Sequence, residues 1–425
     1  MRIGVIADDF TGASDIAGFL VAGGLKTIMY NGVPTELPPA SIEAVVISLK
    51  IRSCPVEEAC SEALASLSFL RQVGCTKVYY KYCSTFDSTR EGNIGPVVDA
   101  LMDALGTDLT IICPSLPVNG RTVCHGYLFV GSSLLSDSPM RHHPITPMRD
   151  SKLERLMEGQ FRGSVGHIYY PVLAQGSDAV HSELERIREG GHRYAVVDTL
   201  TEGDLDTIAE ATEEMVLVTG GSGLAIGICN VLNRGKEISP SDGAAFVPSV
   251  QPAVIISGSC SAQTNAQVAH YKPLAPSRMI EEAAALKSPA NHAQELSKWV
   301  LANSSGPLAP LLYATKSPEE LEASRRLHGD SDVASAIEEV VALIVHHLFD
   351  GGIRTFISAG GETSGVVATT LALEAYLIGP QIDPGVSWLK ALDSTLQCSF
   401  KSGNFGSVDF FEKAQAMCSK EAHDA

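Results

Sequence analysis

The sequence opens with MRIGVIADDFTGASDIAGFL (residues 1–20), a stretch that predicts a strand, a loop and a helix in that order. Residues 3–7 form a short apolar run rich in β-branched side chains, which is typical of a buried strand. From Thr11 onward, apolar residues recur at helical spacing until a glycine pair ends the run. Asp8 and Asp9 stand between the two elements, where like charges repel unless a proton, a cation or a substrate hydroxyl relieves them.

The same strand-to-helix pattern returns along the chain, which predicts parallel sheets covered by helices on both faces. Apolar runs that precede a loop and a helical segment occur at 43–48, 77–82, 109–115, 195–199, 253–257 and 354–359, with a last strand at 395–400. A long stretch rich in Ala and Glu, roughly 278–350, is expected to be helical. The fold class predicted is therefore α/β.

Two domains are expected, because 425 residues exceed what one hydrophobic core usually supports. Residues 235–252, GKEISPSDGAAFVPSVQP, contain three prolines and two glycines and are typical of a linker. The predicted domains are 1–240 and 250–425. Ligands of open parallel sheets bind beyond the carboxyl ends of the strands, so a cleft between the domains is the expected active site.

Composition excludes several classes of function. The 31 Lys and Arg against 49 Asp and Glu give a formal charge of −18, and no basic run is present, so no nucleic-acid partner is expected. No apolar stretch approaches the roughly 20 residues of a membrane span. Ten scattered cysteines and a start without a signal peptide predict a cytoplasmic protein. The sequence leaves the oligomeric state open, a homo-oligomer included.

The stretch KYCSTFDSTREGNIG (81–95) is dense in hydrogen-bonding side chains. A small polyhydroxylated acid would suit these groups, and Arg52 could add a bidentate clamp for its carboxylate. The residues expected to bind it are Arg52, Lys81, Asp87, Ser88, Thr89 and Asn93. The alternative is an ordinary solvated loop held by Asx and Ser turns.

Asp8 and Asp9 admit two interpretations that are compatible with each other. One aspartate caps the helix that begins near Thr11, a role that Asp fills well. The other works on a ligand as a catalytic carboxylate. The sequence does not decide which aspartate has which role, and it assigns no metal ligand.

Two strand-to-helix turns of the second half, SGSCSAQT and SAGGETSG, together with KSGNFG, could present backbone amides and helix N-termini to an anion. These small-residue turns favour a nucleotide site over plain chain reversals. No P-loop or zinc motif is present. The run VTGGSGLAIG (218–227) is interpreted as a tight strand-to-helix turn and not as a dinucleotide fingerprint.

Taken together, IADDFTGASDIA, STFDSTREGNIG, CPSLPVNGRTV, HHPITPMRDS, SGSCSAQT, GGETSG and KSGNFG resemble the four-carbon acid sugar kinases, over residues 4–406. The resemblance implies an N-terminal domain that binds a sugar acid and a C-terminal domain that binds ATP, with Mg²⁺ as cofactor. It is strongest to the branch that phosphorylates the 4-hydroxyl of 3-oxo-tetronates, with D-threonate and D-erythronate as the alternative substrates. The ATP contacts it implies are Ser259, Gly360, Gly361, Glu362, Thr363 and Gly403.

In such a kinase a carboxylate orients the attacking hydroxyl and accepts its proton, and Asp8 and Asp9 are the residues expected to do so. Domain closure is expected to align the substrates and expel water. One rival is a magnesium-dependent sugar phosphatase of the D-x-D-x-T type, although Phe10 occupies the position of its second carboxylate. A sugar-acid sensor without catalysis is the other rival.

Overall fold

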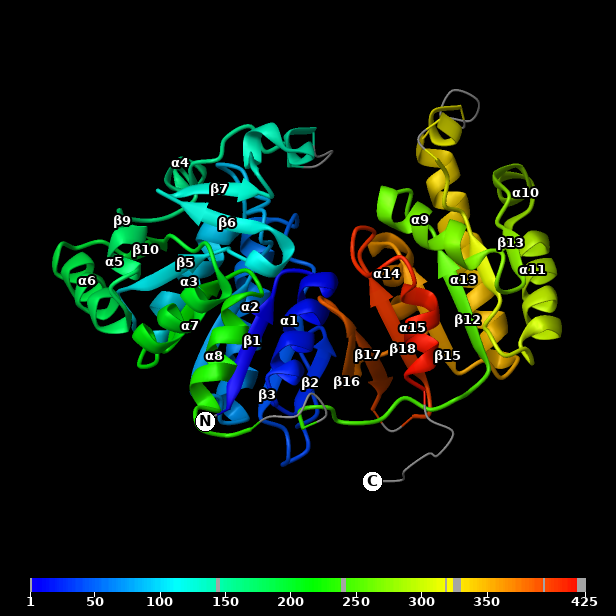
Figure 1. Ribbon diagram of the computed structural model, residues 1–425, viewed down its shortest axis with the longest axis horizontal. Helices are drawn as coiled ribbons and strands as arrows, with labels where there is room; N and C mark the ends of the chain where they lie inside the picture. Colours follow the sequence, from blue (N-terminus) through cyan, green and yellow to red (C-terminus); the bar gives the residue numbers. More distant parts are fainter. Residues whose placement is uncertain are drawn as a thin grey trace. The chain divides into compact units, whose positions relative to one another are not determined.

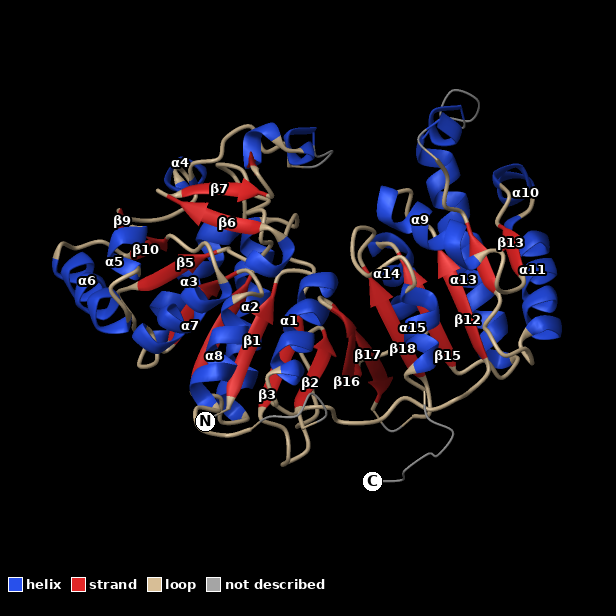
Figure 2. Cartoon of the chain, in the orientation of Figure 1, coloured by secondary structure: helices blue, strands red, loops and turns tan. Residues whose placement is uncertain are grey.

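The computed structural model describes residues 2–142, 146–237, 242–317, 319–323, 330–392 and 394–418. The chain divides between Ala244 and Ala245 into two compact units, called unit 1 and unit 2 below. In each unit, strands form a central sheet with helices in front of it and behind it (Figures 1 and 2). The α/β class with largely parallel sheets is therefore confirmed.

Unit 1 is built on eight parallel strands in the order β2-β3-β1-β4-β11-β5-β10-β9. The strands are β1 (Ile3–Ala7), β2 (Thr27–Asn31), β3 (Ala44–Ser48), β4 (Lys77–Lys81), β5 (Thr110–Cys113), β9 (Val165–Ile168), β10 (Tyr194–Val197) and β11 (Leu217–Gly220). Every residue of β1 is buried, as expected for a strand covered on both faces.

The helices of unit 1 follow the strands as the alternating pattern predicts. They are α1 (Phe10–Ala22), α2 (Val56–Gln72), α3 (Ile94–Leu105), α4 (Leu153–Met157), α5 (Tyr170–Leu173), α6 (Ser177–Glu189), α7 (Glu202–Ala211) and α8 (Leu224–Leu232). A small antiparallel sheet of β6 (Arg121–Cys124), β7 (Tyr127–Val130) and β8 (Ser133–Leu134) is inserted after β5. The alternating pattern did not predict this insertion.

Unit 2 has five parallel strands in the order β13-β14-β12-β15-β18, extended by the antiparallel strands β17 and β16. They are β12 (Ala253–Ser257), β13 (Ser277–Met279), β14 (Leu311–Tyr313), β15 (Thr355–Ala359), β16 (Ala375–Asp383), β17 (Val386–Ala391) and β18 (Gln397–Lys401). The helices are α9 (Ala262–Tyr271), α10 (Glu282–Lys287), α11 (Pro289–Asn303), α13 (Asp330–Asp350), α14 (Gly361–Thr370) and α15 (Phe410–Ala416).

The expectation of one helical region over 278–350 is wrong in part. β14 lies inside that stretch and pairs with both β12 and β13. Its three residues are too few to show the period of a strand, so the sequence pattern missed it. β14 nevertheless positions the turn that follows it, which contributes to the cavity described below.

Candidate functional site

Asp8 and Asp9 follow β1 at the carboxyl end of the parallel sheet of unit 1, and Arg52 joins them. Arg52 Nε and Nη2 donate to Asp8 Oδ2 and Oδ1 at 2.8 and 2.9 Å, which is a bidentate pair. The third nitrogen, Nη1, lies 2.9 Å from Asp9 Oδ2. One guanidinium thus bridges the two aspartates and offsets part of the repulsion between their charges.

The two aspartates differ in exposure and in their partners. The Asp8 side chain is 2% exposed and that of Asp9 is 30% exposed. Burial raises the pKa of Asp8, and Arg52 opposes that shift. Asp9 is the N-cap of α1, because its Oδ1 accepts a hydrogen bond of 2.7 Å from the amide of Gly12. The capping interpretation is confirmed, and the cap is Asp9.

Lys81 ends β4, the strand next to β1, and its side chain is buried beside α1. Its Nζ donates to the carbonyl oxygen of Tyr82 at 2.9 Å. A Cβ atom on Gly12 would lie 2.6 Å from both Lys81 Nζ and Asp9 Oδ1. Glycine at position 12 therefore leaves room beside the start of α1 for both the Lys81 ammonium and the Asp9 carboxylate.

Asp15 and Ser222 extend this polar cluster, and the sequence analysis selected neither. Ser222 Oγ donates to Asp15 Oδ2, and both side chains are buried. Burial raises the pKa of Asp15, while Lys81 acts in the opposite direction. Ser222 belongs to the GGSG turn between β11 and α8, whose interpretation as a tight strand-to-helix turn is confirmed. Its position after a strand was the available signal.

The loop after β4 holds the other residues expected to bind substrate, but several of their side chains are already engaged. Asp87 Oδ1 accepts from Thr85 Oγ1 at 2.6 Å. Asn93 Nδ2 donates to the carbonyl oxygens of Ile51 and Cys54 at 2.6 and 2.7 Å. Because these carbonyls flank Arg52, the Asn93 amide ties the loop to the segment that carries the guanidinium. Thr89 is exposed.

Gln160, which sequence reasoning missed, organises the same loop. Its Oε1 accepts from Ser88 Oγ at 3.2 Å and from the Gly95 amide at 3.0 Å. Its Nε2 donates to the carbonyl oxygens of Thr89 and Leu156, both at 2.9 Å. Gln160 lies about 70 residues from this loop in the sequence, so no local pattern connects them. Residues 143–145 of the HHPITPMRDS stretch lie outside the described residues.

In unit 2 the structure brings the three small-residue turns together. They follow β12, β15 and β18, which are neighbours in the sheet, so their carboxyl ends lie side by side (Figure 1). A Cβ atom on Gly403 would lie 2.3 Å from Ser259 Oγ, and one on Gly360 would lie 3.1 Å from the Ser259 amide nitrogen. One on Gly258 would lie 2.2 Å from Thr363 Oγ1. Glycine is what lets these turns pack closely.

Gly360 and the start of α14 form the part of this arrangement that is best suited to bind an anion. Gly360 has φ +124°, a conformation that side-chain-bearing residues rarely adopt. α14 begins at Gly361, and no side chain caps its first amides among the residues that the structure describes. Free amides at a helix N-terminus bind anions through hydrogen bonds and the helix dipole. α9, in contrast, is capped by Ser261, whose Oγ accepts from the Thr264 amide at 3.1 Å.

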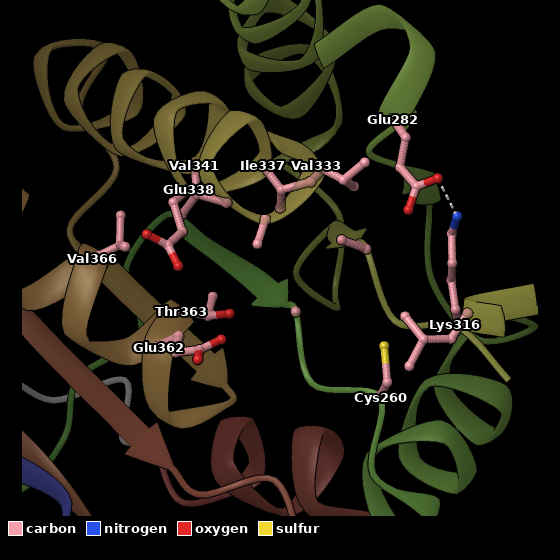
Figure 3. Close-up of a pocket in the computed structure, with 14 residues that line it drawn as sticks. Cys260, Glu282, Lys316, Val333, Ile337, Glu338, Val341, Glu362, Thr363 and Val366 are labelled. Atoms are coloured by element: carbon pink, nitrogen blue, oxygen red, sulfur yellow. Dashed lines mark ion pairs between the residues drawn. The ribbon is translucent and has the colours of Figure 1, made fainter. Parts of the chain in front are cut away.

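A cavity of about 410 Å³ adjoins these turns (Figure 3). Helix α13 contributes an apolar wall, and the turn after β12 and the start of α14 contribute polar groups. Lys316 Nζ and Glu282 Oε2 form an ion pair of 2.6 Å at one side (Figure 3). The residues that line the cavity include Val333, Ile337, Glu338, Val341, Glu362, Thr363 and Val366. A mostly apolar cavity with a few polar groups is typical of cofactor sites. The sequence analysis did not anticipate the α13 wall.

The described part of the chain lacks two features, a membrane-spanning helix and a cluster of metal-ligating side chains. None of its helices combines the length and apolar character that crossing a bilayer demands. Among the same residues, no three or more His, Cys, Asp or Glu side chains are grouped to hold a metal ion.

Comparison with known proteins assigns a family to both units. Residues 3–228 match the family model of a sugar-binding N-terminal domain, and residues 254–411 match that of a nucleotide-binding C-terminal domain. The chain is 50% identical over 418 residues to a 3-oxo-tetronate kinase of Pectobacterium atrosepticum, covering 98% of this chain and 99% of the relative. A 3-oxo-tetronate kinase of Brucella melitensis is 49% identical, covering 99% of this chain and 97% of the relative.

A solved structure from Salmonella typhimurium LT2, described as a "putative tRNA synthase", is similar to nearly the whole chain. It has a TM-score of 0.93 and 48% identity, and the match covers 98% of this chain and 100% of that one. Both domain models and the near full-length identity agree with the motifs quoted from the sequence. The chain therefore belongs to the four-carbon acid sugar kinase family, in the branch whose curated members are named 3-oxo-tetronate kinases.

Proposed function

We propose that this protein is an ATP-dependent kinase that transfers the γ-phosphoryl group of ATP to the 4-hydroxyl of a 3-oxo-tetronate. The observation that carries this proposal is the 50% identity to a curated 3-oxo-tetronate kinase over 98% of the chain. The residues of unit 1 suit a small hydroxylated anion, and those of unit 2 suit a nucleotide. Each step below is argued from those residues.

Unit 1 would hold the sugar acid at the carboxyl ends of β1, β3 and β4. Arg52 is 27% exposed and already oriented by Asp8 and Asp9, so it can add a contact to the substrate without reorganising. Asp87 and Thr89 remain proposed substrate contacts from the loop after β4. Ser88 and Asn93 would act mainly by holding that loop, because their side chains are committed to Gln160 and to the carbonyls of Ile51 and Cys54. Buried Lys81 would contribute positive charge beside Asp9.

Asp9 is the better proposed base of the two aspartates. Its carboxylate is partly exposed, whereas both oxygens of Asp8 are buried against Arg52. A substrate hydroxyl could donate to Asp9, which would orient its oxygen for attack and accept its proton during transfer. Asp8 would then act through Arg52 as a positioning residue. The cap at the start of α1 fixes the direction of the Asp9 side chain.

Unit 2 would bind the nucleotide, with its phosphates at the turns that carry Ser259, Gly360, Gly361 and Gly403. The uncapped amides at the start of α14 are hydrogen-bond donors that an anion such as a phosphate can accept from. Val333, Ile337, Val341 and Val366 give the adjoining cavity an apolar wall on which a purine base could pack. Thr363 and Glu362 lie where the cavity meets the turns (Figure 3).

Mg²⁺ is proposed to enter with ATP, and the residues present fit that arrangement. Glu338 and Glu362 line the same cavity from α13 and α14 (Figure 3), and Mg²⁺ typically takes one or two protein carboxylates together with substrate phosphates. When bound, the ion would neutralise charge on the phosphates during transfer. Glu338 and Glu362 are the carboxylates that would hold it.

A panel of acceptors tests the proposal. Release of ADP is measured with purified protein, ATP and Mg²⁺ against 3-oxo-tetronates of both configurations, D-threonate, D-erythronate and no acceptor. We expect acceptor-dependent ADP release, fastest with a 3-oxo-tetronate, and a product whose phosphorus couples to the C4 protons in NMR. A faster reaction with D-threonate or D-erythronate would identify that acid, and not a 3-oxo-tetronate, as the substrate. Phosphate release from sugar phosphates without ATP would identify the protein as a phosphatase instead. Binding of the sugar acid without turnover would identify it as a sensor.

A further inference from the structure

Lys401, the last residue of β18, is a buried lysine at the centre of the three turns of unit 2. Only 1% of the surface of Lys401 is exposed. Nζ donates to Thr264 Oγ1 and the Ser402 carbonyl oxygen at 3.0 Å, and to the Gly403 carbonyl oxygen at 3.3 Å. The three protons of the ammonium are thus directed at neutral oxygens.

The backbone and side chain of Lys401 connect all three turns. Its carbonyl oxygen accepts from the Gly360 amide at 2.9 Å, so it fixes the residue that precedes α14. The Gly403 oxygen that Nζ reaches also accepts from Ser261 Oγ at 2.6 Å and Thr264 Oγ1 at 2.7 Å, at the start of α9. Gly403 in turn packs on Ser259. Lys401 therefore lies directly beneath the proposed phosphate site.

No carboxylate of the described residues forms an ion pair with Lys401, and burial is the sole cause of its pKa being lowered to about 7. Lys77, at the start of β4 in unit 1, provides a contrast. Its Nζ also donates to three oxygens, the carbonyls of Thr212, Glu213 and Met215. Burial lowers the pKa of Lys77 as well, to about 8, but the nearby Glu213 and Glu214 carboxylates favour its charged form, and Lys401 has no such partner within the described chain. A buried cation without a counter-charge is costly, and the cost falls when an anion binds close by.

We propose that Lys401 is the charged positioning residue of the nucleotide site: its ammonium holds the Gly403 turn from below and takes the phosphate chain of the nucleotide as its counter-charge. The inference rests on the nucleotide site proposed above and adds a residue that the glycine motifs alone did not indicate. It acts through the turn and need not touch the nucleotide.

A purely structural role is the competing explanation, in which Lys401 only ties the turns together by hydrogen bonds. The two explanations differ in how a loss depends on the ligand. If charge matters, the loss of affinity on neutralising Lys401 should grow with the number of phosphates. If Lys401 only joins the turns by hydrogen bonds, its loss should distort the site and weaken the binding of all these ligands alike, whatever their number of phosphates.

Calorimetry with the full-length protein at about pH 6, below the lowered pKa of Lys401, tests this with adenosine, AMP, ADP and ATP on Lys401→Met and Lys401→Gln. We expect adenosine affinity within about twofold of wild type and a loss of about tenfold or more for ADP and ATP, with AMP between them. Gln retains hydrogen-bond donors but no charge, so it should fail to restore ADP binding. Lys77→Met is the matched control, since it removes a buried lysine away from these turns, and it should leave ADP affinity unchanged.

Equal losses for adenosine and ADP, restored affinity in Lys401→Gln, or unchanged ADP affinity in Lys401→Met would each overturn the proposal. Wild type that binds neither ADP nor ATP would instead refute the nucleotide site itself. Wild type also gives a test that needs no folded variant: inorganic tripolyphosphate, which has the charge but no base, should compete with ADP. Lack of competition would count against a charged site beneath the turns.

Discussion

Arg52 holds Asp8 by two hydrogen bonds, from Nε to Oδ2 at 2.8 Å and from Nη2 to Oδ1 at 2.9 Å, and it reaches Asp9 with its remaining nitrogen. This geometry gives the adjacent aspartates different tasks. Both oxygens of the buried Asp8 side chain accept hydrogen bonds from the guanidinium, whereas the Asp9 carboxylate is partly exposed. The first two predictions follow from that difference.

Asp9→Asn should lower kcat by roughly two to four orders of magnitude, because the proposed base is lost. Asn is as good an N-cap as Asp, so α1 should remain intact and the variant should fold. Steady-state kinetics gives the loss, and calorimetry should give an unchanged ATP affinity. Asp103→Asn, which alters an exposed carboxylate paired with Arg162 and Arg193, should keep wild-type turnover. Wild-type kcat in Asp9→Asn would remove the catalytic role.

Asp8→Asn should cost more stability than Asp9→Asn, because it removes a buried partner of Arg52. Breaking a buried ion pair by deleting one partner typically costs about 3 kcal/mol. Urea unfolding of both variants measures the difference. A free energy of unfolding in Asp8→Asn equal to that of wild type would show that the Asp8 pair does not stabilise the fold.

Gln160→Leu should raise the KM for the sugar acid by about tenfold or more while the KM for ATP stays unchanged. The substitution removes the hydrogen bonds to Ser88, Gly95, Thr89 and Leu156 that order the loop after β4. Gln175→Leu, which loses an exposed hydrogen bond to Pro171, is the matched control. An equal rise of both KM values would point to general destabilisation instead.

Gly360→Ala should weaken ATP binding severely, since its φ of +124° is strained for alanine and the added Cβ would approach the Ser259 amide to 3.1 Å. Gly365→Ala is the control within the same helix, because its Cβ would meet nothing within 4 Å. That change should leave ATP affinity intact and stabilise the protein by about 0.5–1 kcal/mol. Calorimetry and thermal unfolding distinguish the two. Similar ATP affinity in both variants would contradict the role of the Gly360 turn.

Lys401 should make stability depend on pH. Its pKa is about 7 in the folded protein against 10.5 for an unperturbed lysine, so between these values the unfolded chain binds a proton that the folded chain lacks. Wild type should therefore gain stability relative to Lys401→Met as the pH rises above 7, by at most about 1.4 kcal/mol per pH unit. Urea unfolding at pH 7 and pH 9 measures this gap. A difference between the two proteins that is the same at pH 7 and pH 9 would show that folded Lys401 is still charged.

Much of the fold could be predicted because its signals are local. The run of residues 3–7, the capping aspartate and the glycine that ends α1 lie within one short stretch of sequence, and an apolar run followed by a helical segment recurs along the chain. β14 has only three residues, and the β16–β17 hairpin breaks the alternation of strand and helix, so neither gave such a signal. The inter-domain cleft stays a prediction.

The sites were predicted less completely, for a physical reason. Glycine motifs and clusters of polar residues are visible in sequence, and the structure does gather the turns at Ser259, Gly360 and Gly403. Gln160 and Ser222 act through contacts with residues far away in the chain, and Lys401 matters because of burial without a counter-charge. Burial and long-range pairing arise only when the sheet is assembled. The roles assigned to individual residues stay predictions until the variants are measured.

The amide of Asn93 has a mechanical consequence. It donates to the carbonyls of Ile51 and Cys54, so the segment that carries the Arg52 guanidinium and the loop after β4 should move together. Ordering either by a ligand would then slow hydrogen–deuterium exchange in both, so residues 51–54 and 87–93 should gain protection together when the sugar acid binds. Asn93→Ala would uncouple the two, leaving one segment protected while the other continues to exchange.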